Sequence, residues 1–87
     1  MSNIDSTLNE RGETYGDFGS FSFLCQALKT TLRRHKGWER LSSDQKESVE
    51  MIIHKVSRIV NGDPNHLDSW VDIQGYARLS EKCIKHE

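Results

Sequence analysis

The chain has 87 residues, 34% of them hydrophobic and 29% charged, which is enough for one small folded domain with a modest core. Twelve lysines and arginines against thirteen aspartates and glutamates give a net charge of −1, and this balance argues against a general nucleic-acid-binding surface. No apolar run approaches the ~20 residues of a membrane span and the start of the chain has no signal-peptide pattern, so we expect a cytoplasmic protein without membrane contact.

Residues 1–20 are expected to form an acidic arm that contains three glycines. A short helical turn near its start would need tertiary contacts to persist, because isolated short helices are unstable in water. The motif Tyr15-Gly16-Asp17-Phe18 places aromatic rings in this arm, and a loop seldom exposes several rings without burying them. We therefore expect the arm to fold back over the helices as a lid, in preference to a ligand clamp.

The first predicted helix spans residues 21–36, with Ser20 as its N-cap and Gly37 just beyond its C-terminus. Its apolar residues recur at helical spacing and form one stripe. The stripe consists of Phe21, Leu24, Cys25, Leu28 and Leu32. Basic residues fill the last turn, where positive charge complements the helix dipole.

The second predicted helix spans residues 43–60 and has the clearest signals. Ser42 followed three residues later by Gln45 is typical of a capping box, and Gly62 followed by Pro64 predicts the end of the helix. One face is apolar and consists of Val49, Ile52, Ile53, Val56, Ile59 and Val60. The opposite side carries Glu47, His54 and Arg58.

The third predicted helix spans about residues 67–84, and one broad face of it is apolar. That face consists of Trp70, Ile73, Tyr76, Ala77, Cys83 and Ile84. Both Cys25 and Cys83 lie on apolar stripes, so we expect two buried, reduced thiols and no disulfide. No strand pattern occurs. The sequence thus predicts a single all-α domain over residues 1–87, with three helices and a folded-back N-terminal arm.

A binding surface is predicted at the arm and along the first helix. Phe23 lies off the apolar stripe, so it is expected to pack on the arm or on a partner. The positive charge at the end of this helix either complements the helix dipole or contacts an acidic protein or a nucleic acid. The lack of interleaved aromatic residues weakens the nucleic-acid reading. The candidate partner-binding residues are Tyr15, Asp17, Phe18, Phe23, Arg33, Arg34 and Lys36.

Asp72 is the most informative single residue, because it lies within the apolar face of the third helix. A half-buried carboxylate must be paired, hydrogen-bonded or protonated, since desolvating an isolated charge is costly. We expect it to pair with Lys55 or Arg58 of the second helix, or to accept a hydrogen bond from Tyr76. The alternative is a metal ligand.

Glu47 and Glu50 lie three residues apart on one strip of the second helix. Two carboxylates at this spacing can hold a divalent cation if further oxygens converge on it. In a monomer the strip is expected to be a solvated face, whereas a second subunit packed against it would change that interpretation.

Several short motifs follow one another at specific spacing between residues 10 and 79. They are Glu10-Arg11-Gly12, Tyr15-Gly16-Asp17-Phe18, Met51-Ile52-Ile53-His54-Lys55, Arg58-Ile59, Gly62-Asp63-Pro64, Asp68-Ser69-Trp70-Val71-Asp72-Ile73 and Gly75-Tyr76-Ala77. In these motifs the chain resembles a family of small phage and prophage proteins of unknown function. The resemblance implies a phage-encoded protein of the bacterial cytoplasm and brings no settled activity.

A fainter resemblance is to the MazG-like all-α nucleoside triphosphate pyrophosphatases. Those enzymes hold Mg²⁺ over a triphosphate with an ExxE pair on one helix and an ExxD pair on a later helix. Glu47 and Glu50 match the first pair. Only Asp72 matches in the second, because Ser69 stands in place of an acid, and Asp68 is a substitute turned by about 100°. The resemblance implies Mg²⁺ as a cofactor, bound by these four carboxylates. It also implies a dimer, since the enzymes build their sites from paired helix layers.

Two functions remain open on these grounds. The one we favour is a non-enzymatic accessory protein, without a cofactor, that binds a host or phage macromolecule, a protein before a nucleic acid. An inhibitor of a bacterial defence complex, such as an anti-CRISPR protein, belongs to this class. The alternative is a MazG-like nucleotide-binding or nucleotide-hydrolysing protein that depends on a metal ion and acts as a homodimer.

Overall fold

The computed structural model describes residues 3–84, so the two ends of the predicted domain lie outside the described residues. Over this range the chain consists of α1 (Asn3–Tyr15), α2 (Phe18–Arg34), the short 3-10 helix η1 (Lys36–Arg40), α3 (Ser43–Asn61) and α4 (Leu67–Cys83). The all-α prediction is confirmed, with four α-helices in the described part of the chain instead of three. None of these helices is both long and apolar enough to cross a membrane.

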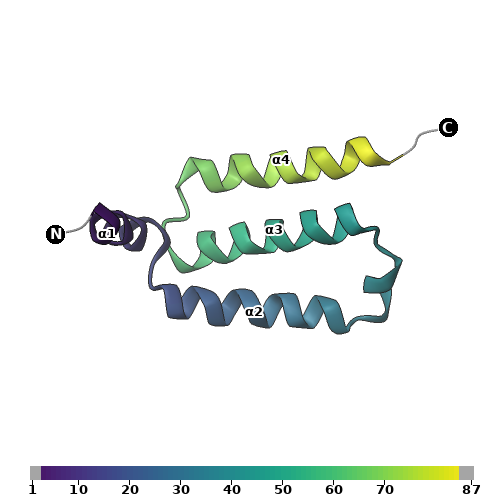
Figure 1. Ribbon diagram of the computed structural model, residues 1–87, viewed down its shortest axis with the longest axis horizontal. Coiled ribbons are helices and arrows are strands. Elements are labelled where there is room, and N and C mark those ends of the chain that lie inside the picture. Colours follow the sequence, from purple (N-terminus) through teal and green to yellow (C-terminus); the bar gives the residue numbers. More distant parts are fainter. Residues whose placement is uncertain (1–2, 85–87) are drawn as a thin grey trace.

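Three of the helices lie side by side in one layer, with α3 between α2 and α4 (Figure 1). The helix α1 lies at the end of this layer, near the start of α2 and the end of α3. It is seen nearly end-on, so its axis is roughly perpendicular to the plane of the layer (Figure 1). The result is an elongated molecule with principal extents of 55 × 26 × 24 Å.

A single layer of helices gives a thin core. Among the described hydrophobic residues, those that are buried are Phe21, Cys25 and Trp38. Trp38 lies in η1 and was not among the residues that helical periodicity assigned to the core. Most of the other predicted core residues are half-buried, namely Leu24, Leu28, Leu32, Val49, Ile52, Ile53, Val56, Ile59, Ile73 and Tyr76. Half-burial follows from the architecture, because residues 3–84 form no second layer that covers the two faces of the first.

The predicted apolar face of the third helix is wrong at several positions. Trp70 is 49% exposed, and its ring N–H donates a hydrogen bond to the backbone oxygen of Pro64 at 2.8 Å. Ala77, Cys83 and Ile84 are exposed as well. The reason is that α4 lies at the edge of the layer, where α3 covers one side of it and the other side is open.

The two cysteines have different surroundings, contrary to the expectation that both are buried. Cys25 is buried in α2, whereas Cys83 is exposed at the end of α4. The Asp44 carboxylate beside Cys83 accepts a hydrogen bond from the thiol and raises the pKa of Cys83. Cys83 is therefore held as a thiol by a neighbouring charge and not by burial in an apolar face.

The acidic arm is helical over most of its length, since α1 covers Asn3–Tyr15. Gly12 lies inside this helix and a Cβ atom there would meet no other atom within 4 Å, so the glycine is tolerated on an open surface. The arm also does not cover the layer as a lid, because α1 packs at its end (Figure 1). Glycine content led the sequence analysis to underestimate the helix here.

The helix α2 begins three residues earlier than predicted and has a different N-cap. Asp17 is the cap, and its carboxylate accepts a hydrogen bond from the backbone N–H of Ser20 at 2.8 Å. At the other end His35 caps the helix, and Gly37 belongs to η1, where its N–H donates to the His35 ring at 2.9 Å.

The predictions for the second helix are confirmed at both ends of α3. The Ser42 hydroxyl accepts a hydrogen bond from the Gln45 backbone at 3.3 Å, and the Gln45 side chain accepts one from the Ser42 backbone at 3.0 Å. Gly62 is the C-cap. Val60, assigned to the apolar face, is instead 68% exposed.

The side of α3 that was expected to face away from the apolar face is itself packed. Glu47 is exposed, but the His54 ring contacts the Phe21 ring of α2 at a centroid distance of 5.0 Å. The Arg58 guanidinium lies over the rings of Tyr15 and Phe21. A helix in the middle of a layer has a neighbour on each side, so both of its flanks are covered. The apolar face that is visible in the sequence corresponds to only one of these two covered flanks.

Candidate functional site

The turn between α1 and α2 interlocks with the loop between α3 and α4. Gly16 has φ of +79°, in the left-handed region that favours glycine. A Cβ atom at this position would overlap the backbone oxygen of Asn61. A Cβ atom at Gly62 would overlap the backbone of Thr14 and Tyr15 in the same way. The two glycines therefore allow two backbone segments to approach each other directly.

Hydrogen bonds join the same two segments. The side-chain amide of Asn61 donates to the backbone oxygens of Tyr15 and Asp17, both at 2.9 Å. The backbone N–H of Asp63 donates to the backbone oxygen of Thr14 at 2.7 Å. The Tyr15-Gly16-Asp17 and Asn61-Gly62-Asp63 segments, 46 residues apart in the chain, thus form one structural unit. We call this unit the interlocked turn.

The Tyr15 side chain lies between two basic residues, His66 and Arg58, and contacts both. Its hydroxyl lies 3.3 Å from Nε2 of His66, and the two rings meet edge to face at a centroid distance of 5.4 Å. On the other side the guanidinium carbon of Arg58 lies 4.3 Å from the Tyr15 ring centroid. A cation held over an aromatic face at this distance is attracted by the ring electrons, so Tyr15 fixes the position of Arg58.

A pocket of about 560 Å³ opens beside the interlocked turn, between α1, the start of α2 and the end of α3. Its lining residues are Leu8, Arg11, Gly12, Tyr15, Gly16, Asp17, Phe18, Phe21 and Arg58. Rings and aliphatic carbon form most of this lining. Pockets of roughly 300–1,000 Å³ with apolar walls and a few polar groups are the usual small-ligand and side-chain binding sites of proteins.

Charge in the pocket is predominantly positive. The His54 ring next to Phe21 is desolvated and lies near Arg58, which lowers the pKa of His54 to about 4, so this histidine is neutral at pH 7. Arg58 and Arg11 have no carboxylate partner among the described residues, whereas Asp17 already caps α2. The geometry therefore combines an apolar pocket with two available guanidinium groups.

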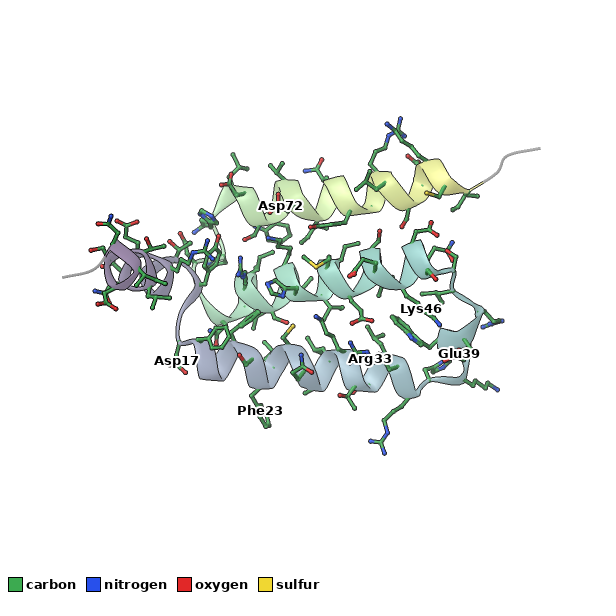
Figure 2. The ribbon with its side chains drawn as sticks, in the orientation of Figure 1. Asp17, Phe23, Arg33, Glu39, Lys46 and Asp72 are labelled. Carbon is green, nitrogen blue, oxygen red and sulfur yellow. The ribbon has the colours of Figure 1, made fainter. Side chains whose placement is uncertain are left out.

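The predicted partner-binding residues fall in four places. Tyr15, Asp17 and Phe18 line the pocket. Phe23 is 81% exposed and points away from the layer at the outer edge of α2 (Figure 2). Arg33 forms an ion pair with Glu50 of α3. The remaining two, Arg34 and Lys36, are exposed at the end of α2 opposite to the pocket.

Apart from two glycines, four lining residues were not predicted from the sequence as binding residues: Leu8, Arg11, Phe21 and Arg58. Phe21 was assigned to the core, where it also belongs, and Arg58 to an open helix face. The spacing of Leu8, Arg11 and Tyr15 over two helical turns is the signal that could have found one wall of the pocket.

Three of the four carboxylates proposed as metal ligands lie near separate basic side chains, and the fourth, Glu47, is exposed. Asp72 pairs with Lys55 at 3.0 Å, as its position on the third helix predicted (Figure 2). Glu50 pairs with Arg33, Asp68 lies 3.9 Å from His66, and Glu47 is exposed. Within residues 3–84 no three histidine, cysteine, aspartate or glutamate side chains are close enough together to hold a metal ion.

The comparisons with known proteins place the chain by family alone. No curated protein and no solved structure matches it. Residues 2–84 match the family described as Domain of unknown function (DUF6378). Because this match covers nearly the whole chain, the protein belongs to the DUF6378 family.

Proposed function

We propose that the chain is a small protein-binding accessory protein that holds its partner at the pocket beside the interlocked turn. The observation that carries this proposal is a pair of exposed apolar side chains at the pocket. Phe18 is 77% exposed and Leu8 is 59% exposed, and both line it. Ile4, one helical turn before Leu8, is 66% exposed. Contiguous exposed apolar side chains around a concave site are typical of protein interaction surfaces.

The chain's resemblance to phage and prophage proteins gives this proposal its most specific form. It is a phage-encoded protein that acts in the bacterial cytoplasm, and its partner is a component of the host, with a defence complex as the leading case. Nucleic acid is a weaker candidate, because a net charge of −1 and an apolar pocket do not favour a polyanion.

Site-specific photo-crosslinking in the cells that naturally make the protein tests the proposal. A photoreactive amino acid at Phe18 is expected to give one discrete protein adduct, since this side chain lies at the mouth of the pocket. The same amino acid at Ser43, which is exposed at the start of α3, is the matched control. Adducts of equal yield at both positions, or none at Phe18, would contradict the proposal.

The MazG-like alternative requires Glu47, Glu50 and Asp72 to share an Mg²⁺ ion. In one copy of the chain, cations from α2 and α3 already neutralise Glu50 and Asp72. This pairing supports the binding function over hydrolysis. The alternative would need a second copy that supplies further ligands, and the Mg²⁺ experiment in the Discussion addresses it.

A further inference from the structure

We propose that the pocket recognises a carboxylate next to an apolar side chain, as in an acidic peptide segment of the partner, and that Arg58 binds this carboxylate. The inference deepens the proposed function and rests on it for the source of the carboxylate. Four observations carry it: the fixed position of Arg58, the absence of an internal partner for it, the charge balance of the pocket and its exposed apolar rim.

Arg58 is held in place before any ligand arrives. Its guanidinium carbon lies 4.3 Å from the Tyr15 ring centroid and 5.8 Å from the Phe21 ring centroid. Stacking on aromatic rings occupies the face of the planar guanidinium and leaves its N–H donors free at the edge. An arginine fixed in this way loses little side-chain entropy when it binds an anion.

The other cations of α3 are already paired. Lys55 contacts Asp72 at 3.0 Å, and Lys46 contacts Glu39 at 3.5 Å. In contrast, none of the carboxylates in residues 3–84 lies within ion-pair distance of Arg58, although the chain as a whole has more acidic than basic residues. An acidic chain that leaves a preoriented arginine in a pocket without a carboxylate has a site for an external one.

The net charge of the pocket favours a ligand with a single negative charge. Two arginines, Arg11 and Arg58, and one aspartate, Asp17, line it, and this leaves one net positive charge. Nearby His54 is neutral at pH 7 and adds none. A carboxylate matches both the charge and the planar fork of a guanidinium, in which two parallel hydrogen bonds form. A doubly charged phosphate would leave excess negative charge next to Asp17.

The apolar part of the ligand has a place beside this charge. Phe18 of α2 and Leu8 of α1 both line the pocket and are exposed. A volume of about 560 Å³ accommodates an aromatic or large aliphatic side chain together with the carboxylate. The ligand chemistry is therefore an acid flanked by a hydrophobic residue.

Titration of the ¹⁵N-labelled chain with N-acetyl-phenylalanine tests the inference, since this probe carries a carboxylate beside an aromatic ring. We expect millimolar binding, with chemical-shift changes at the Arg58 Nε–H and at the backbone of Tyr15, Gly16 and Asp17. N-acetyl-phenylalanine amide, which lacks the charge, should bind at least about tenfold more weakly. Equal binding of acid and amide, or no shifts at these residues, would overturn the inference.

Two further arms identify the ligand class and protect against loss of folding. Phenyl phosphate should bind no more tightly than the carboxylate, and tighter binding would show that the site takes phosphate instead. Arg58→Lys should weaken the carboxylate by about tenfold because a single ammonium cannot form the paired bonds. Because Arg58→Lys also changes the contact with the aromatic rings, a second variant is needed that leaves this contact in place. Arg11→Gln, at an exposed lining residue, serves this purpose and should weaken binding of the carboxylate too. The matched control Arg40→Gln, which is exposed in η1 at the far end of α2, should leave it unchanged.

The two proposals fail in different ways. Selective binding of the carboxylate with no crosslinked protein at Phe18 would keep the anion site and remove the protein partner. A discrete crosslink at Phe18 without selectivity for the carboxylate would keep the protein partner and remove the anion site.

Discussion

Gly12 and Gly16 lie four residues apart and differ in what a side chain would meet. Gly16→Ala should destabilise the protein by at least about 1–3 kcal/mol, because alanine is strained at φ +79° and its Cβ would overlap the Asn61 backbone. Gly12→Ala should stabilise it by roughly 0.5–1 kcal/mol, since alanine favours a helix and meets no atom within 4 Å. Urea unfolding of both variants measures the contrast, and equal effects would show that the interlocked turn does not form.

Only part of the role of Gly16 and Gly62 can be predicted from the sequence. Gly16 and Gly62 stand out in the sequence as turn residues, and Gly62 ends α3 as predicted. The sequence does not show that each glycine leaves room for the backbone of the other segment, because the two glycines lie 46 residues apart. Their pairing depends on how α1 and α3 are placed in space.

The contact between α2 and α3 makes stability depend on pH through His54. Desolvation beside Phe21 and the nearby charge of Arg58 lower the pKa of His54 from 6.5 to about 4 in the folded chain. Between these two pH values the unfolded chain binds a proton that the folded chain does not. The contribution of His54 to the free energy of unfolding is therefore fully present above pH 6.5 and should be lost as the pH decreases towards 4.

Melting temperatures at pH 7 and pH 5 measure this dependence. The wild type should lose more stability between the two pH values than His54→Gln, which carries no proton in either state. The comparison uses each protein's own difference between pH 7 and pH 5, so a general loss of packing in the variant does not affect it. The same difference in both proteins would contradict the lowered pKa of His54.

The contact between α3 and α4 depends on the ion pair of Lys55 and Asp72. The Lys55 side chain is only 14% exposed, so Asp72→Asn leaves a largely buried ammonium without its partner and should cost about 1–2 kcal/mol. The surface pair of Arg78 and Glu81 is the matched control, and Glu81→Gln should change stability by less than about 0.5 kcal/mol.

The same variant separates the two functions. If Asp72 is a partner of Lys55 alone, millimolar Mg²⁺ should leave the melting temperature of the wild type unchanged. A rise with Mg²⁺ in the wild type that is absent in Asp72→Asn would mean that the cation binds the folded state through this carboxylate. That outcome would favour the MazG-like function over the accessory protein.

The helices differ in how far the sequence predicts their bounds and packing, for physical reasons. The start of α3 was predicted to the residue and its end to within one, because a capping box and a C-terminal glycine are local signals. The helix α1 was mistaken for a loop, since Gly12 within it and Gly16 just after it lower the local helix propensity, and its packing on α2 and α3 is not visible in the sequence. The charged flank of α3 was assigned to solvent because the sequence does not show that α3 has a neighbour on both sides.

The whole molecule exposes more surface than a monomer of its size should. Its accessible surface is 6650 Å², compared with about 5200 Å² expected for a compact 10.0 kDa chain. Its radius of gyration is 15.2 Å, compared with about 12 Å. Both differences follow from the single layer of helices, which leaves side chains such as Leu67 and Val71 exposed at 70% and 49%.

We expect the chain to form a homodimer in solution, because a second copy would supply the missing layer. Two compact chains joined as one body would expose roughly 8700 Å² by the same scaling. Two separate copies expose 6650 Å² each, so the excess falls within the roughly 2,000–5,000 Å² that obligate homodimers bury. Light scattering coupled to size-exclusion chromatography should give twice the 10.0 kDa chain mass at micromolar concentration. A mass of one chain would contradict the dimer, and it would also remove the MazG-like function, because within one chain Glu50 and Asp72 pair with separate cations and residues 3–84 hold no metal-binding cluster.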